Sequence, residues 1–380
     1  MILGGYVNGY SIIRELYQKG VKDIVLFDTT RSLASYSNKI RRFFLIDSTL
    51  ESLYDALIAL NREYSKLIIF PTDDLQLEHL HKLYSRIEHF CFLPFNPKNI
   101  IESLDKYHQY SCCEQLGIPY PKTVQLNHPG DMDKISCIQF PILIKPTKRD
   151  DLKTDVFRNL QLDTRHDLEK NIELLNDYLN AGVSFIASEI ILGDGSNIYA
   201  YVGYRNKFGR IVNEWTGKKL AQFPHDFGVF ASASNQAPDI VRDQGRALLH
   251  GMDLMGIVEP EFKYDSRDGK YKLMEINLRS MMWHRVGNLS GVNIQYTQYL
   301  DAIGEEASLQ HQYKKTDIHL VYFKHELYNL LTRSNYLHVF YNNIFKSNET
   351  HFAVFSADDI FPCMIDMKIV LRKILRGEWS

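Results

Sequence analysis

Glu261, Glu275 and Asn277 are residue types that bind divalent cations, and their spacing could bring them together. Residues 256–279 read as a β-hairpin with a short loop that ends at Gly269. In such a hairpin Glu261 lies directly opposite Glu275, and Asn277 lies on the same face two residues further along. Facing carboxylates repel each other, so a site closed to water keeps them only with a cation between them. Two carboxylates and an amide oxygen are hard ligands, which favours magnesium bound to nucleotide phosphates over zinc.

The same hairpin has a second interpretation. Its charges could face water, as is common on the solvated face of an antiparallel sheet. The hairpin alone does not decide between an exposed charged face and a metal site.

Residues 274–279 closely resemble the E-x-N-x-R segment of ATP-grasp ligases, with Leu278 where many members have proline. In that family an acidic residue on one strand and a Glu-x-Asn on the next hold two magnesium ions against the phosphates of ATP. The resemblance implies that the two glutamates and the asparagine of the hairpin bind two magnesium ions, which manganese can replace. It also implies that Arg279 stabilises the transferring phosphoryl group or an acyl phosphate.

The composition is that of an ordinary soluble globular protein with two or three domains, since 45% of its 380 residues are apolar and 24% are charged. The net charge of -2 gives no general attraction to nucleic acid. The five cysteines form no C-x-x-C pair, which is typical of reduced thiols in the cytoplasm. No apolar stretch has the length of a transmembrane helix and no signal-peptide pattern is present, so we expect a cytoplasmic protein without stable membrane insertion.

The first 95 residues alternate between strand and helix patterns. Apolar strands are expected at residues 1–3, 23–28 and 66–70, with a helix over residues 10–19. This pattern predicts a small open parallel sheet with helices on its faces.

The glycine turn at residues 4–9 could also belong to a dinucleotide-binding fold, with Asp28 holding a ribose. However, Tyr6 stands where that motif requires its middle glycine and would block the pyrophosphate. The turn also lacks the Gly-Lys-Ser or Gly-Lys-Thr of a phosphate-binding loop. It instead resembles the loop of the domain that precedes the ATP-grasp fold, where such loops often border the site for the carboxylate substrate.

A helix follows in which Ser103 or Asp105 is the expected N-cap and Gly117 the expected end, with two prolines beyond it. Asp105, Lys106 and the segment after Gly117 closely resemble the entry to ATP-grasp domains, in which the lysine reaches a phosphate of ATP. The resemblance gives Lys106 that role. Without it, this residue would be interpreted as a solvated helix lysine.

Residues 140–146 read as an apolar strand that ends in a lysine and a proline. A lysine at such a position either extends into water or meets an anion. The family resemblance favours the anion and implies that Lys145 contacts the α-phosphate and the edge of the adenine. Many ATP-grasp members carry a glycine-rich lid in the next segment, whereas residues 131–181 contain no glycine, and Lys148 and Arg149 are the candidates for the lid.

A strand expected over residues 184–192 is followed by Gly193-Asp194-Gly195. This segment resembles the hinge that receives adenine between the two halves of an ATP-grasp domain. The resemblance implies that backbone groups of Glu189 and Ile191 pair with the base, which needs a donor and an acceptor in register, and that Asp194 holds the ribose hydroxyls. An ordinary turn after a strand has the same pattern.

Residues 215–228 resemble a segment of the D-aspartate ligase branch and of related carboxylate-amine ligases, in which basic residues precede a Pro-x-x-x-Gly turn. By that resemblance Lys218 or Lys219 supplies positive charge to an anionic substrate or to the γ-phosphate. Surface lysines without this role are an equal alternative. His225 and Asp226 could form an acid-base pair, although a His-Asp beside a proline turn is more often a turn cap.

The resemblance weakens after about residue 300, where a helical extension is expected. Residues 367–376 place apolar residues at helical spacing opposite Lys368, Arg372 and Arg376. Such a helix either packs against a core with its charged face in water, which is the usual arrangement, or docks on a membrane surface.

These features predict an α/β fold of the α+β ATP-grasp type in three parts. A small parallel-sheet N-terminal domain covers residues 1–95, and a two-subdomain ATP-grasp domain covers residues 96–300 with its hinge near 188–194. A helical C-terminal extension covers residues 301–380.

The resemblance implies an ATP- and magnesium-dependent carboxylate-amine ligase that forms an amide bond through an acyl phosphate. Its expected partners are a small-molecule carboxylate and an amine, with an amino acid, a uronic acid or a cell-envelope precursor as the substrate. A catalytically inactive nucleotide-binding module that acts as a sensor or scaffold is the alternative, followed by an NAD-dependent oxidoreductase. The oligomeric state stays open, with a homodimer among the options.

Overall fold

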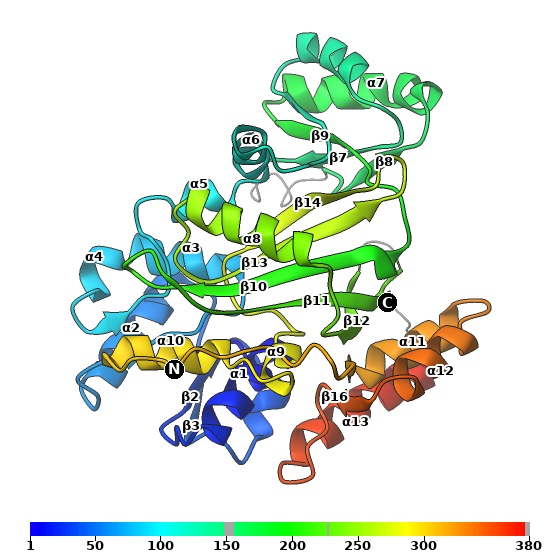
Figure 1. Cartoon of the computed structure of the whole chain (residues 1–380). Helices are drawn as coiled ribbons and strands as arrows, with labels where there is room; N and C mark the ends of the chain where they lie inside the picture. Colours follow the sequence, from blue (N-terminus) through cyan, green and yellow to red (C-terminus); the bar gives the residue numbers. More distant parts are fainter. Residues whose placement is uncertain (148–155, 226–227, 377–380) are drawn as a thin grey trace. The chain divides into compact units, whose positions relative to one another are not determined.

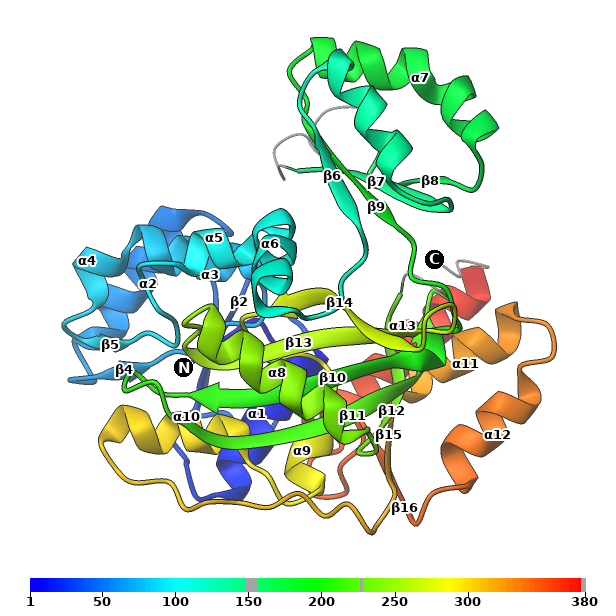
Figure 2. The same ribbon diagram turned by 45° about the horizontal axis from the view of Figure 1, so that its top comes forward.

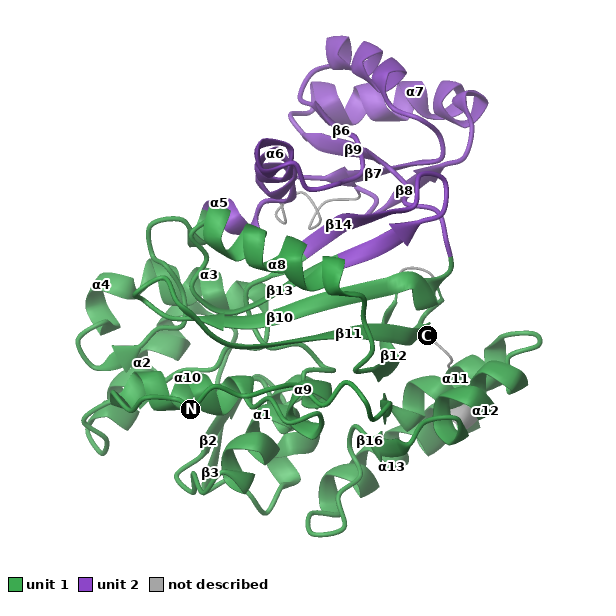
Figure 3. Cartoon of the chain, in the orientation of Figure 1, with its two compact units in different colours: residues 1–101, 194–261, 276–380 green, residues 102–193, 262–275 purple. Residues whose placement is uncertain are grey.

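The computed structural model describes residues 1–147, 156–225 and 228–376 of the chain (Figure 1). These residues form two compact units (Figure 3). Unit 1 comprises residues 1–101, 194–261 and 276–380, and unit 2 comprises residues 102–193 and 262–275. The units interleave along the sequence, whereas the predicted domains follow one another, and the boundaries of those domains stay a prediction.

The N-terminal part of unit 1 confirms the predicted parallel sheet. Strands β1, β2 and β3 pair in parallel, β4 pairs in parallel with β5, and Ile2 bridges in parallel to Phe70. The elements are β1 (Ile2–Leu3), α1 (Val7–Gln18), β2 (Val25–Asp28), β3 (Arg42–Leu45), α2 (Leu50–Asn61), β4 (Leu67–Ile68), α3 (Asp74–Lys82), α4 (Tyr84–Ile87) and β5 (Cys91–Phe92). Strand β3 was not predicted, because its exposed Phe44 and Leu45 do not follow the pattern of a buried parallel strand.

A seven-stranded sheet has the order β14-β13-β10-β11-β12-β15-β16. Its strands are β10 (Ile198–Arg205), β11 (Ile211–Phe223), β12 (Val229–Ser234), β13 (Gly256–Asp265), β14 (Lys270–Asn277), β15 (Ile318–Val321) and β16 (Glu349–Phe352). The predicted hairpin is confirmed as β13 and β14, with Gly269 in the left-handed region at φ 69°. Residues 262–265 and 270–275 of this hairpin belong to unit 2, and the rest belong to unit 1.

Helices cover both faces of the unit 1 part of this sheet (Figure 1). Adjacent residues of β11 point to opposite faces of the sheet. On one face, Arg246 of α8 (Asp239–Gly251) donates through Nε to the carboxylate of Glu214 at 2.8 Å. On the other face, Trp215 lies against Gly287 of α9 (Arg285–Leu289). The ring of Trp215 meets that of Trp283 edge to face, with centroids 5.3 Å apart. These tryptophans belong to one hydrophobic core that also contains α1 and α10 (Ile294–Ile303), so the N-terminal strands and the large sheet share a core.

Unit 2 is a four-stranded sheet with the order β6-β9-β7-β8 and a helix packed on it (Figure 2). Leu175 and Leu179 of α7 contact Ile142 and Ile144 in the core of this unit. Its elements are α6 (Lys106–Leu116), β6 (Thr123–Leu126), β7 (Ile142–Pro146), β8 (Leu160–Leu162), α7 (Arg165–Asn180) and β9 (Phe185–Glu189), and α5 (Ile100–Leu104) precedes them.

The predicted start and end of α6 are confirmed. The side chain of Asp105 accepts from the backbone N–H of His108 at 2.8 Å, so Asp105 rather than Ser103 is the N-cap. Gly117 ends the helix in the left-handed conformation, at φ 67°. Lys106 is therefore the first residue of the helix.

The C-terminal extension contains helices, as predicted, but it also contributes two strands. The helices are α11 (Phe323–Thr332), α12 (Leu337–Phe345) and α13 (Phe361–Arg376). Strand β15 pairs with β12 in antiparallel and with β16 in parallel fashion, so the extension completes one edge of the large sheet. The expected single apolar face of α13 is only partly right, because Val370 is buried while Leu371 is 57% exposed.

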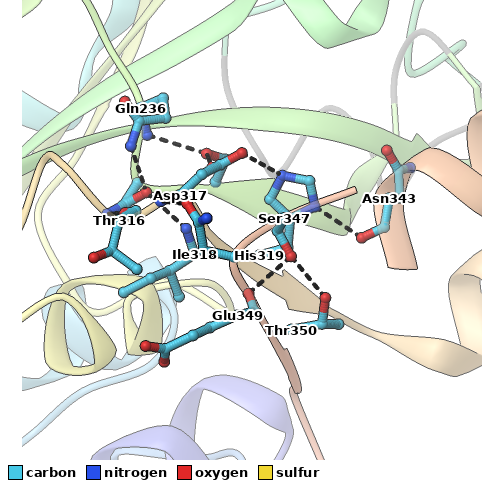
Figure 4. A network of polar contacts seen from close by, with 12 residues as sticks. Gln236, Thr316, Asp317, Ile318, His319, Asn343, Ser347, Glu349 and Thr350 are labelled. Carbon is cyan, nitrogen blue, oxygen red and sulfur yellow. Dashed lines mark hydrogen bonds and ion pairs between the residues drawn. The ribbon is translucent and has the colours of Figure 1, made fainter. Parts of the chain in front are cut away.

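A network of polar contacts joins these added strands to β12 and α12 (Figure 4). Asp317 accepts from Ser234 Oγ at 2.8 Å, and His319 lies 2.8 Å from the carbonyl oxygen of Asn343 through Nδ1. Ser347 donates to the carbonyl of Glu349 at 2.9 Å. Sequence periodicity does not reveal short strands of this kind, because four residues are too few to show a clear alternation of apolar and polar side chains.

Across the described ranges, no helix combines the length and the apolar character needed to span a lipid bilayer.

The close approach of α9 to β11 leads to a stability prediction. A Cβ atom added at Gly287 would lie 2.3 Å from Nε1 of Trp215, whereas one added at Gly130 would meet nothing within 4 Å. We expect Gly287→Ala to lower the free energy of unfolding by about 1–3 kcal/mol through overpacking, measured by urea denaturation. Gly130→Ala is the matched control and should change it by less than about 0.5 kcal/mol. Equal effects of the two substitutions would contradict the packing described for α9.

Candidate functional site

The candidate residues divide between the two units. Unit 1 contains Glu261, Asn277, Arg279, Lys218, Lys219 and Asp194, whereas unit 2 contains Glu275, Lys106, Lys145, Glu189 and Ile191. Glu261 and Glu275 thus belong to different units, and their predicted position opposite each other stays a prediction.

In unit 1, Glu261 forms a buried ion pair with Lys219. The Nζ atom of Lys219 lies 2.7 Å from both carboxylate oxygens of Glu261, and the two side chains are 7% and 2% exposed. Lys219 lies on β11 and Glu261 on β13, with β10 between these strands. Of the two candidate lysines, the fold therefore brings Lys219 to the acidic strand.

Lys218 points to the other face of β11, because side chains alternate along a strand. Its Nζ lies 5.3 Å from the centroid of the Tyr199 ring. Burial lowers the pKa of Lys218, and the neighbouring Asp194 carboxylate acts against that shift. Asp194 itself caps a short 3₁₀ turn by accepting from the N–H of Ser196 at 2.6 Å. The structure therefore associates Lys218 with Asp194, and not with Glu261.

Glu259 is a further site residue that the sequence analysis did not select. Its side chain is fully buried, and its Oε2 lies 2.6 Å from Nε2 of His284. Burial lowers the pKa of His284 to about 3, with the nearby Arg279 as the next cause, so the ring is neutral at pH 7 and donates its N–H to the carboxylate. Asn277 Nδ2 donates to Glu259 Oε1 at 3.4 Å. Glu259 could have been found from the Glu-x-Glu spacing, which places it on the same strand face as Glu261.

The residues of β13 and β14 in unit 1 fit a hard divalent cation. Glu259 and Glu261 bring two negative charges into a region nearly closed to water, where Lys219 supplies one positive charge and His284 is neutral. Carboxylate and amide oxygens are also the donors that magnesium prefers. Within the described ranges, no cluster of three or more His, Cys, Asp or Glu side chains has the geometry of a metal site, and the predicted set contains only two carboxylates.

Arg279 lies at the wall of a cavity of about 490 Å³ in unit 1. Its Nε donates to Asp74 Oδ1 at 2.7 Å, at the start of α3. Much of the remaining wall comes from the loops that follow β1, β2 and β3, where the carboxyl ends of these parallel strands meet, and α3 contributes Leu75, Gln76 and His79. Asp28 does not present its carboxylate for a ribose, because its oxygens accept from the N–H groups of Gly5 and Thr29 at 2.8 and 2.7 Å. A dinucleotide-binding site would therefore lack both the acidic residue that holds the ribose and the middle glycine of the motif.

In unit 2, Lys106 and Lys145 surround Glu275. Lys106 Nζ lies 2.8 Å from Glu275 Oε2, and these side chains are 33% and 36% exposed. Burial and the charge of Lys106 lower the pKa of Lys145 to about 8, and Arg158 contributes in the same direction. Within the described ranges Lys145 has no hydrogen-bond or ion-pair partner. Lys145 thus has Lys106 and Arg158 as cationic neighbours, and such a group of cationic side chains favours an anionic ligand.

The hinge segment leaves one acceptor and one donor available. The N–H of Glu189 donates to the carbonyl of Lys122 at 3.0 Å, and that of Ile190 donates to Pro141 at 2.8 Å. The carbonyl of Ile190 accepts from Arg267 at 3.0 Å. Apart from the hydrogen bonds between paired strands, the carbonyl of Glu189 and the N–H of Ile191 form no backbone hydrogen bond within the described part of the chain. An acceptor and a donor two residues apart are what the amino-bearing edge of adenine requires.

Three residues named from the sequence lie outside the described residues. These are the lid candidates Lys148 and Arg149 and the possible acid-base residue Asp226.

Comparison with known proteins gives a distant relationship. No protein-family model matches the sequence. A curated relative, D-aspartate ligase of Enterococcus faecium (strain Aus0004), is 25% identical over 288 residues, which are 72% of this chain and 62% of that protein. The chain therefore spans less than two thirds of the curated relative that it matches.

Solved structures extend the likeness over most of the chain. N5-carboxyaminoimidazole synthetase from Staphylococcus aureus has a TM-score of 0.64 and 13% identity, and the match covers 83% of this chain and 79% of that one. L-amino acid ligase from Bacillus licheniformis has a TM-score of 0.59 and 14% identity, with 80% and 73% covered. Biotin carboxylase from Campylobacter jejuni has a TM-score of 0.61 and 15% identity, with 82% and 72% covered.

At these identities the structural likeness concerns the fold, which agrees with the parallel N-terminal sheet and the antiparallel sheets described above. The chain has the ATP-grasp fold and is distantly similar in sequence to D-aspartate ligase.

Proposed function

We propose that the protein is an ATP- and magnesium-dependent carboxylate-amine ligase, which joins the two substrates through an acyl phosphate. The observation that carries this proposal is the pair of buried carboxylates on β13, Glu259 and Glu261, next to Asn277 of β14. Burying two carboxylates is costly, and a divalent cation bound beside them would offset that cost.

The nucleotide would be held by unit 2 residues. The carbonyl of Glu189 and the N–H of Ile191 would pair with adenine. Lys145 would contact the α-phosphate, and Lys106 would contact another phosphate. The cationic neighbours of Lys145 support this assignment, because ammonium and guanidinium groups bind phosphate oxygens through charge-assisted hydrogen bonds.

Glu261, Glu275 and Asn277 would hold magnesium, which when bound neutralises and orients the phosphates of ATP. Lys218 or Lys219 would add positive charge near the γ-phosphate or an anionic substrate. Of these two, the ion pair with Glu261 favours Lys219.

The carboxylate substrate would attack the γ-phosphorus in line, which forms an acyl phosphate and releases ADP. The amine would then attack the acyl carbon, and the tetrahedral intermediate would expel phosphate to leave an amide. Arg279 would stabilise the negative charge that develops on the transferred group. No protein nucleophile is needed, because the phosphoryl group itself activates the carboxylate.

The cavity beside Arg279 supports an amino acid as the carboxylate substrate. Its wall carries the cationic Arg279 together with the carboxylates of Asp47 and Asp73, and this combination suits a ligand with both charges. D-aspartate ligase and L-amino acid ligase are both named for amino acids. A uronic acid or a cell-envelope precursor is the other substrate class that we propose for the carboxylate.

The first test of the reaction uses ATP, magnesium and hydroxylamine with a panel of amino acids and sugar acids. We expect ADP and an acyl hydroxamate with at least one acid. Glu275→Gln should lower the rate of ADP formation by roughly 10²-fold or more, because it removes a charged metal ligand. Glu173→Gln on the exposed face of α7 is the control and should leave the rate unchanged. ATP binding without ADP or hydroxamate across acids and amines would instead favour a nucleotide-binding module without turnover.

A second prediction concerns the pH dependence of nucleotide binding. Because the pKa of Lys145 is lowered to about 8, this side chain is largely neutral at pH 9 in the free protein. A phosphate next to it would raise the pKa again, so ATP binding should take up a proton, and affinity should fall about tenfold per pH unit above pH 8. Calorimetry in buffers of different ionisation enthalpy measures this uptake.

Lys145→Arg serves as the control for that measurement. A guanidinium stays charged throughout this range, so the variant should bind ATP with little pH dependence. An unchanged proton uptake in Lys145→Arg would show that another group is responsible.

A further inference from the structure

Each carboxylate that we expect to bind metal has a lysine at ion-pair distance. In unit 1, Lys219 Nζ lies 2.7 Å from both oxygens of Glu261. In unit 2, Lys106 Nζ lies 2.8 Å from Glu275 Oε2. The lysines assigned to phosphate and the carboxylates assigned to metal are therefore paired with each other in this structure.

The geometry of the Lys219 pair is that of a cation held by a chelating carboxylate. One ammonium nitrogen at equal distance from two oxygens occupies the region that a divalent cation would take in a bidentate arrangement. Both side chains are almost closed to water, so neither charge can lose its partner unless another charge replaces it.

We propose that Lys219, and in the same way Lys106, is an internal counter-ion that exchanges partners when the nucleotide and the metal arrive. This inference rests on the proposed function. In the free protein the ammonium groups neutralise the carboxylates. When the metal binds Glu261 and Glu275, the ammonium groups pass to the phosphate oxygens of ATP.

Metal and nucleotide binding are then coupled by electrostatics. Metal alone would have to displace the Lys219 ammonium from Glu261, although both side chains are nearly closed to water. Nucleotide alone would meet Lys219 and Lys106 while each is paired with a carboxylate. Metal at the carboxylates releases the ammonium groups, and phosphate at the ammonium groups releases the carboxylates, so each ligand should bind much more tightly in the presence of the other.

The test measures binding of Mn²⁺ by electron paramagnetic resonance, with and without a non-hydrolysable ATP analogue. The wild-type protein should bind Mn²⁺ alone weakly, and the analogue should tighten that binding at least tenfold. Lys219→Met should bind Mn²⁺ alone at least tenfold more tightly than wild type, because the competing ammonium is gone, and should lose most of the coupling. Lys207→Met, at an exposed lysine in the turn between β10 and β11, is the control and should behave like wild type in binding Mn²⁺ alone.

Thermal unfolding gives a readout that needs no nucleotide. In EDTA, Lys219→Met should melt well below wild type, because Glu261 is left buried without its counter-ion, and Mn²⁺ should restore much of the loss. The double variant Lys219→Met, Glu261→Gln should recover its melting temperature without metal and should not respond to Mn²⁺. Where Lys219→Met does not fold in EDTA, refolding with and without Mn²⁺ serves as the readout.

The exchange proposal is overturned if Lys219→Met binds Mn²⁺ alone no more tightly than wild type, or if Mn²⁺ stabilises both proteins equally. A structural ion pair would give those results. The ligase proposal fails separately, if wild type forms no ADP and no hydroxamate, because the Mn²⁺ response of Lys219→Met requires no turnover. Conversely, wild type could form ADP and hydroxamate while wild type and Lys219→Met bind Mn²⁺ with equal affinity. That result would leave the ligase proposal intact and reject only the exchange of partners by Lys219.

Discussion

Two carboxylates buried on one face of β13 impose the main constraint on this structure. Burying Glu259 and Glu261 requires partners that replace the hydrogen bonds of each carboxylate to water and balance its charge. The chain supplies these partners from separate elements: His284 and Asn277 for Glu259, and Lys219 for Glu261. The Lys219–Glu261 ion pair therefore links β11 to β13 across β10, and a protein that needed only stability would do better with apolar residues there.

The C-terminal extension is tied to the N-terminal part of unit 1 by buried polar contacts. Asp359 accepts from the hydroxyl of Tyr10 at 3.1 Å and from the N–H of Asn38 at 3.0 Å. Tyr6, on the wall of the cavity beside Arg279, lies 3.0 Å from the hydroxyl of Tyr322. The extension thus supports the loop that borders the proposed substrate cavity, in addition to completing the large sheet with β15 and β16.

Local sequence features were sufficient to predict the helices and strands that have characteristic capping or turn residues or a clear apolar pattern. The capping aspartate and the terminal glycine of α6, the turn glycine of the β13–β14 hairpin and the alternating strand-helix pattern of the first 95 residues each depend on backbone conformation within a few residues. Strand β3 and the two short strands of the extension could not be found this way. These strands form because a neighbouring strand offers its backbone groups for pairing. Four residues are too few to show the alternation of apolar and polar side chains that would predict a strand.

The amino-acid sequence by itself determined the chemistry that is present on β13 and β14, because residue type and two-residue alternation place acidic and amide oxygens on one strand face. It could not decide between Lys218 and Lys219, or show that Glu259 is buried against His284. Those outcomes depend on which β11 side chains share a face of the sheet with Glu261 and on where the segment before α9 packs against that sheet. Lys219 and Glu261 are 42 positions apart and Glu259 and His284 are 25 positions apart, so only tertiary packing brings them into contact. Charge pairing acts over a few ångströms in space and produces no periodic pattern along the chain.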